Sequence, residues 1–121
     1  MKKNSCDVDL IHLEDVKTCQ KEYDKINSEL LLSQLKLIAD EKRFKILHSL
    51  SIKEELCVCD LANILDASIA TTSHHLQQLK KIGAVDSRKD GKLLYYKLKN
   101  KTLSQIIEFG LTLNSGSVNH G

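Results

Sequence analysis

Residues 56–85, LCVCDLANILDASIATTSHHLQQLKKIGAV, decide the fold of this chain. The pattern predicts a short helix capped by Asp60, then a turn at residues 66–68 and a longer helix from Ile69 to Ile82. Ser68 can cap the longer helix, because a serine side chain accepts hydrogen bonds from its free backbone N–H groups. Gly83 ends it, since glycine readily adopts the left-handed conformation that follows a helix. Two helices joined by so short a turn indicate a helix-turn-helix.

The longer helix has an apolar face and a polar face. The face predicted to lie against the core consists of Ile69, Thr72, Ser73, Leu76 and Leu79. The opposite face carries Thr71, His74, Gln78 and Lys81, with His75 and Gln77 on its flanks. In a helix-turn-helix the second helix enters the major groove of DNA, so the polar face is predicted to meet base edges and phosphates.

Residues 85–99 are predicted to form a β-hairpin. Asp90-Gly91 is a two-residue signal for a type I′ turn, and apolar residues alternate along the strand that follows. Near the turn lie the basic residues Arg88, Lys89 and Lys92. We therefore expect a basic wing beside the helix-turn-helix.

The rest of the chain is predicted to be mostly helical. The expected helices are Tyr23–Ala39 with Ser28 as N-cap, Asp40–Leu50 with Phe44, Leu47 and Leu50 inward, and Thr102–Leu113. The pair Asp40/Arg43 suits the start of the second of these helices by its charges and its spacing. The predicted class is mainly α with a small β-hairpin, ordered as four helices, the recognition helix, two strands and a last helix. Residues 1–121 are predicted to form one domain, with an N-terminal arm at 1–22 and a flexible tail at 114–121.

Composition narrows the class of protein. The 121 residues suit a single domain, and no segment approaches the roughly 18 apolar residues of a membrane span. Lys2-Lys3 is followed by no apolar segment of a signal peptide, so a cytoplasmic location without membrane contact is expected. Residues 1–67 hold 10 basic and 13 acidic residues, whereas residues 68–99 hold 7 basic and 2 acidic. Positive charge is thus concentrated where DNA contact is predicted.

Cys57 and Cys59 stand just before the helix-turn-helix. In a reducing cytosol, cysteines are more often ligands, catalysts or core residues than parts of a disulfide framework. Two residues apart, these two cannot bridge each other without strain. Soft thiolates favour Cd(II), Zn(II), Pb(II) or As(III)-like species, but two ligands are too few for tight and selective binding. A thiol pair beside a DNA-binding helix suggests that metal occupancy controls DNA binding.

These motifs together resemble the ArsR/SmtB metalloregulators, in particular their CadC-type cadmium- and lead-responsive branch. The resemblance rests on the cysteine box 56–62, on Thr72-Ser73-His74-His75-Leu76 and on the Asp90-Gly91-Lys92 hairpin. It implies a homodimeric winged helix-turn-helix repressor that is not an enzyme. Such a repressor binds double-stranded operator DNA with an inverted repeat and releases it when Cd(II), Pb(II) or Zn(II) binds. The regulated genes typically encode metal efflux.

The resemblance also bears on the ligand set. Cys6, from the N-terminal arm of the same or the partner subunit, is the expected third metal ligand beside Cys57 and Cys59. For the fourth, Cys19, His12, Asp9 and no protein ligand all remain open. The branch usually has a second arm cysteine four residues after the first, where this chain has Leu10.

A second metal site of the family, on the last helix, is expected to be absent. The positions that would supply its carboxylates and imidazoles hold Asn100, Thr102, Leu113 and Gly116. The apolar stripe of the last helix instead suits a dimer interface, and a symmetric dimer would recognise an inverted repeat.

The candidate DNA contacts divide into two kinds. Side chains on the polar helix face can contact base edges, whereas lysine and arginine mainly contact phosphates. The whole set is Ser68, Thr71, Thr72, His74, His75, Gln78, Lys81, Arg88, Lys89 and Lys92.

Two alternative functions keep the same fold, namely a repressor whose thiols sense oxidation and a repressor that senses arsenite.

Overall fold

The structure is a computed structural model that describes residues 12–99 and 101–118. The chain divides into two compact units, residues 1–33 and residues 34–121, and each is described by itself. Among the described residues, no helix is both long enough and apolar enough to cross a membrane.

The first unit contains helix α1 (Leu13–Asp24) and the beginning of helix α2 (Ser28–Ile38). Residues 25–27 are not helical and separate α1 from α2, so the prediction of one helix over Tyr23–Ala39 was wrong. The predicted cap Ser28 is also wrong by one residue. The side-chain oxygen of Asn27 accepts a hydrogen bond from the backbone N–H of Leu30 at 3.1 Å, which is the role of an N-cap.

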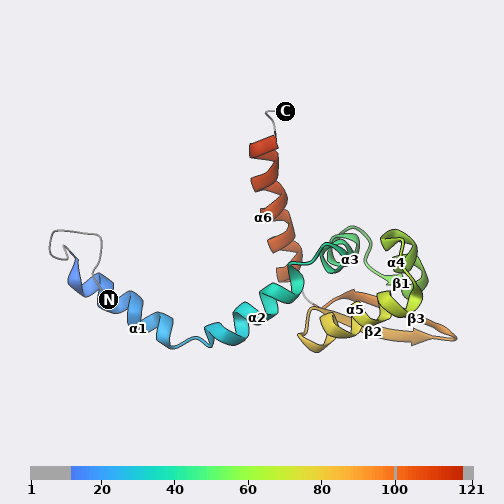
Figure 1. The fold of residues 1–121 in the computed structure, drawn as a ribbon, viewed down its shortest axis with the longest axis horizontal. Helices are drawn as coiled ribbons and strands as arrows, with labels where there is room; N and C mark the ends of the chain where they lie inside the picture. The colour runs from blue at the N-terminus through green and yellow to red at the C-terminus, as the bar shows by residue number, and fades with distance from the viewer. Residues whose placement is uncertain (1–11, 100, 119–121) are drawn as a thin grey trace. The chain divides into compact units, whose positions relative to one another are not determined.

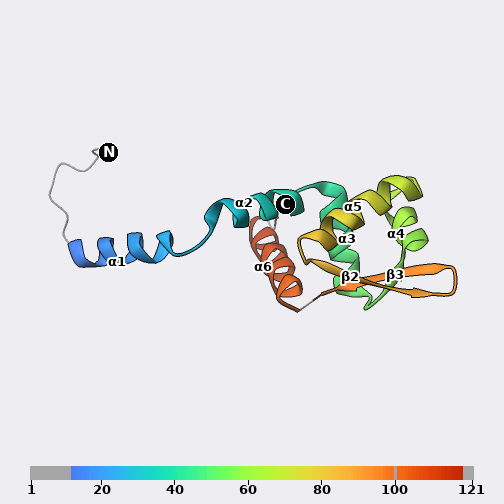
Figure 2. The ribbon, with the colours of Figure 1, turned by 90° about the horizontal axis from the view of Figure 1, so that it is seen from below.

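The second unit is a winged helix-turn-helix. Its helices are α3 (Glu41–Ile52), α4 (Val58–Leu65), α5 (Ile69–Lys81) and α6 (Lys101–Val118). Its strands are β1 (Leu56–Cys57), β2 (Val85–Asp90) and β3 (Leu93–Leu98). They form an antiparallel sheet in the order β1-β3-β2, and the hairpin runs along one side of the helices α3, α4 and α5 (Figures 1 and 2). The predicted fold class is thereby confirmed.

One core holds this unit together. Its fully buried apolar side chains come from α3, α4, α5 and β2, and they are Ile46, Leu47, Leu61, Leu76, Leu79 and Val85. Tyr96 of β3 and Ile107 of α6 complete the cluster. Burial of each such side chain contributes about 1.5–3 kcal/mol, so the core fixes how the helix-turn-helix lies on the sheet.

Two apolar side chains predicted to face inward are on the surface instead. Phe44 and Ile69 are 40% and 49% exposed. In both helices other residues occupy the buried positions. Phe44, for example, stacks on His48 with 6.4 Å between the ring centroids, while Ile46 takes the buried position in α3.

The caps of α3 and α5 match the sequence pattern. The Asp40 side chain accepts from the backbone N–H of Arg43 at 3.0 Å, and Ser68 Oγ accepts from that of Thr71 at 3.0 Å. Gly83 follows α5 with φ of +80°, the left-handed conformation expected of it.

The hairpin and the last helix differ in detail from the prediction. Asp90 pairs with Leu93, so the two-residue turn is Gly91-Lys92 and not Asp90-Gly91. Within that turn only Gly91 has positive φ, +64°, which is the φ pattern of type II′ and not of type I′. Helix α6 continues to Val118, so the prediction of a tail from residue 114 was wrong over residues 114–118.

Two substitutions on α5 test the observed core. Leu76→Ala should lower the free energy of unfolding by about 2–5 kcal/mol, because it leaves a cavity among buried side chains. Ile69→Ala, at a half-exposed position on the same helix, should change it by no more than about 0.5 kcal/mol. Urea unfolding at one fixed protein concentration measures both. Equal losses would mean that Ile69 belongs to the core after all.

Candidate thiol site and nucleic-acid interface

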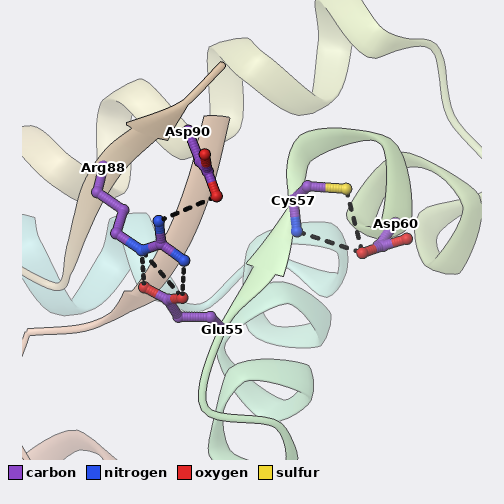
Figure 3. Close-up of polar contacts among 5 residues, drawn as sticks. All are labelled: Glu55, Cys57, Asp60, Arg88 and Asp90. Carbon is purple, nitrogen blue, oxygen red and sulfur yellow. Dashed lines mark hydrogen bonds and ion pairs between the residues drawn. The ribbon is translucent and has the colours of Figure 1, made fainter. Parts of the chain in front are cut away.

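Cys57 has two structural roles in the second unit. It is the last residue of β1 and the N-cap of α4, and its thiol is buried, whereas Cys59 in the first turn of α4 is exposed. The prediction that Asp60 caps this helix was wrong, because Asp60 is the third residue inside it. Its carboxylate accepts hydrogen bonds from the backbone N–H of Cys57 at 3.3 Å and from the Cys57 thiol at 3.1 Å (Figure 3).

Strand β1 joins the thiol pair to the wing. Leu56 pairs with Tyr96 of β3, and Cys57 pairs with Tyr95. This strand was not predicted, because it is two residues long and its partner lies about forty residues away in the sequence. The strand places the start of α4 beside the wing. A movement of α4 would therefore be transmitted to the wing through β1, and a movement of the wing to α4.

An ion pair reinforces the same junction. The guanidinium of Arg88 on β2 donates to Glu55 through Nε at 2.8 Å and Nη2 at 2.8 Å, while Asp90 lies 3.7 Å from Nη1 (Figure 3). Arg88 also lies over the ring of Tyr95, 4.8 Å from its centroid. The hydrogen bonds from Arg88 lower the pKa of Glu55, and the same bonds raise the pKa of Arg88. Arg88 is therefore held on the wing by the residue that precedes β1.

The donors at this junction suit a soft cation only in part. Cys57 and Cys59 supply two sulfur atoms at the start of one helix, which is fewer than the three or four ligands such ions take. Within the described residues, no group of three or more His, Cys, Asp or Glu side chains is placed to hold a metal ion. Cys19 is exposed on α1 in the other unit, and His12, also exposed, precedes that helix. Cys6 and Asp9 lie outside the described residues.

The predicted DNA face is largely on the surface. Ser68, Thr71, His74 and Lys81 of α5 and its cap are exposed, as are Arg88, Lys89 and Lys92 of the wing. His75 and Gln78 are half-buried. Thr72 is fully buried, and its hydroxyl has no partner among the described residues. The prediction that Thr72 contacts DNA was therefore wrong, because a buried side chain cannot reach the DNA.

A residue that the sequence did not single out holds part of this face in place. Arg43 was recognised only as a partner of Asp40, whose carboxylate lies 3.9 Å from its Nη2. Its Nη1 lies 3.1 Å from His75 Nδ1 and donates to Gln78 Oε1 at 3.0 Å. Its Nε donates to the backbone carbonyl of Leu37, at the end of α2. No local pattern could reveal contacts with side chains 32 and 35 residues away.

The surroundings of His75 lower its pKa and so favour the neutral ring. Burial is the first cause that lowers its pKa, and the charge of Arg43 is the second. His74 and Lys42 act in the same direction, whereas Asp40 opposes them. Because Arg43 only donates, Nδ1 must be the accepting nitrogen and the proton of the neutral ring must sit on Nε2.

The fold and this polar face define a winged helix-turn-helix regulator. Residues 40–87 match the family described as bacterial regulatory protein, arsR family. A solved structure from Mycobacterium bovis, titled as a homodimeric winged helix-turn-helix DNA-binding domain, is 26% identical with a TM-score of 0.66. The match covers 78% of this chain and 90% of that one.

Two curated relatives extend the match over nearly the whole chain. The cadmium resistance transcriptional regulatory protein CadC of Listeria innocua is 45% identical over 111 residues, which is 92% of this chain and 93% of the relative. A CadC homolog of Staphylococcus aureus is 43% identical over 108 residues, which is 89% of each chain. The chain belongs to the ArsR/SmtB family of transcriptional regulators.

The contact between Arg43 and His75 should make stability depend on pH. The unfolded chain takes up a proton at His75 as the pH falls through about 6.5, whereas the folded chain resists it because its pKa is lowered. The contribution of His75 is therefore complete above that pH and is lost progressively below it. His75→Gln should remove part of the decline in unfolding free energy between about pH 7.5 and 5.

His74→Gln is the matched control, since His74 is an exposed neighbour on the same helix. It should leave the decline in place. Urea unfolding across the pH range measures all three proteins, and a His75→Gln profile parallel to the wild type would contradict the assignment.

Proposed function

We propose that this chain is a metal-responsive transcriptional repressor. Its homodimer binds operator DNA through α5 and the wing, and it releases the DNA when Cd(II), Pb(II) or Zn(II) binds Cys57, Cys59 and Cys6. The observation that carries the proposal is the place of Cys57, which both ends the strand paired with the wing and caps the first helix of the helix-turn-helix. The names of the curated relatives support cadmium as the effector.

The DNA surface rests on charge and exposure. Thr71, His74 and Gln78 are proposed to contact base edges, since their donors and acceptors match those of the major groove. Phosphate contacts are assigned to side chains that fix the register of the protein, namely Ser68, Lys81, Arg88, Lys89 and Lys92. His75, held by Arg43, lies at the border of this surface.

The metal chemistry follows from the thiols. A soft ion binds thiolates, so it must displace the thiol protons, and metal affinity falls in acid. The proton of Cys57 is directed at the Asp60 carboxylate, and that hydrogen bond is lost when a metal ion takes its place. Cys6 is proposed as the third ligand. Cys19, His12, Asp9 and no protein ligand stay open for the fourth, and the expected lack of a second site on α6 stays a prediction.

The dimer is supported by the surface of α6. Ile106, Phe109 and Leu113 are 53%, 64% and 61% exposed on the single chain, and their spacing of three and four residues places them on one face of α6, as in an apolar interaction surface. The similar M. bovis domain is described as homodimeric. A twofold-symmetric pair would read an inverted repeat, and release of the DNA would derepress a metal-efflux or resistance operon.

Metal release can be measured directly with a labelled promoter fragment. Added Cd(II) should lower the fluorescence anisotropy of the wild-type complex, and a chelator should restore it. Cys57→Ser should bind DNA within about twofold of the wild type yet ignore Cd(II), because serine keeps the size but loses the soft ligand. Cys59→Ser and Cys6→Ser should likewise bind DNA and fail to respond to Cd(II). A Cys57→Ser protein that still releases DNA with Cd(II) would exclude this site.

Cys19→Ser addresses the fourth ligand. If Cys19 binds the ion, the ultraviolet charge-transfer absorption of the Cd(II) complex should fall by about a quarter, as expected when one of four thiolates is lost. If it does not, the spectrum should match the wild type. Release by diamide that a reductant reverses, with no response to Cd(II), would favour the redox alternative instead.

The ion pair at the wing yields a separate prediction. Glu55→Gln should raise DNA affinity about two- to fivefold, because Arg88 no longer has to leave a carboxylate in order to reach a phosphate. Glu54→Gln is the matched control, since it makes the same change in net charge without freeing Arg88. Anisotropy titrations at several salt concentrations measure both variants. Equal gains would mean that only net charge matters and that Arg88 does not contact phosphate.

A further inference from the structure

We infer that Arg43 is a positioning residue that decides which base Gln78 can read. The inference rests on the proposed contact of α5 with DNA and deepens it. Arg43 and Gln78 come from different helices, and Arg43 Nη1 donates to Gln78 Oε1 at 3.0 Å. A side chain proposed to read DNA is therefore already engaged by its own protein.

The orientation of the Gln78 amide follows from the chemistry of arginine. A guanidinium has donors and no acceptor, so only the carbonyl oxygen of Gln78 can face Arg43. The amide nitrogen must then point away from Arg43, and no partner for it is present among the described residues. Arg43 occupies one of the two lone pairs of the oxygen, whereas both donors of the amide nitrogen stay available, so the group that Gln78 offers most readily to DNA is a donor.

Arg43 is itself firmly held. Its side chain is only 16% exposed, and it lies close to the Asp40 carboxylate, the Leu37 carbonyl and His75 Nδ1. These contacts come from three different elements, the end of α2, the cap of α3 and the face of α5. Because these contacts hold the Arg43 guanidinium in one position, Arg43 also holds the side-chain oxygen of Gln78 in one position.

This arrangement changes the expected specificity. A free glutamine reads adenine with both atoms of its amide, accepting from N6 and donating to N7. With its oxygen directed at Arg43, Gln78 turns its amide N–H groups toward DNA, and guanine offers two acceptors, N7 and O6, on its major-groove edge. We therefore expect guanine, and not adenine, at the base pair that Gln78 contacts.

The experiment is selection of preferred sites from a random pool of duplex DNA, followed by anisotropy with single-base variants of the selected site. Gln78→Ala identifies the position, since its preference should fall there to within about twofold. At that position the wild type should bind guanine at least about fivefold more tightly than adenine. Arg43→Lys keeps the charge but loses the planar fork, so the freed amide should now favour adenine.

Lys42→Arg is the matched control, because it also keeps the charge and Lys42 is exposed on the same helix. It should retain the guanine preference. If Arg43 were only structural, Arg43→Lys would weaken all sites equally and leave the base preference unchanged. That result would overturn the inference.

A second measurement needs no variant of Arg43. Replacing the selected guanine with 7-deazaguanine removes one acceptor, which should weaken binding of the wild type but not of Gln78→Ala. Equal weakening of both proteins would overturn the inference while leaving DNA binding intact. If the wild type enriched no sequence, or if no position depended on Thr71, His74 or Gln78, the proposed DNA face itself would be wrong.

Discussion

The pairing of β1 with β3 is the constraint on which the rest of the arrangement depends. Two residues, Leu56 and Cys57, form the outer strand of the sheet, and directly after them the chain enters α4. Because Cys57 belongs to both elements, its thiol lies where the wing and the helix-turn-helix meet. Glu55, one residue further back, holds Arg88 on the wing by accepting hydrogen bonds from its Nε and Nη2. The consecutive residues Glu55, Leu56 and Cys57 thus join the thiol pair to both parts of the proposed DNA surface, the wing and the helix-turn-helix.

This junction explains how a small event could have a large effect on DNA binding. Typical coupling between two sites amounts to about 1–3 kcal/mol, which is comparable to the loss of a cap or of one hydrogen-bonded contact. The buried thiol of Cys57 shares the Asp60 carboxylate with its own backbone N–H. An ion at the thiol would remove one of these two bonds at the first turn of α4. In the proposed mechanism such a change would reach the wing because α4 follows directly on β1, which pairs with β3 of the wing.

The sequence predicted the parts of the fold that are governed by local patterns. The cap Ser68, the stop at Gly83 and the core positions Leu76 and Leu79 of α5 involve residues within a few turns of each other, and each was found where expected, although Ile69 of the same predicted face is exposed. Strand β1 was missed because a two-residue strand has no period, and its existence depends on β3. Asp60 was predicted as the N-cap of α4 but is its third residue. Aspartate suits both positions, so the local sequence does not distinguish them.

Arg43 shows most clearly why the candidate site could be predicted only in part. Its spacing from Asp40 indicated a local helix-start pair, and that contact is present. Its contacts with His75 and Gln78 arise only because α3 and α5 pack against one core, which no pattern of charges predicts. A glutamine side chain can pair with adenine through both atoms of its amide, but the bond from Arg43 fixes the direction in which the Gln78 amide points. The specificity of a recognition helix therefore depends on the residues beneath it as well as on those it presents.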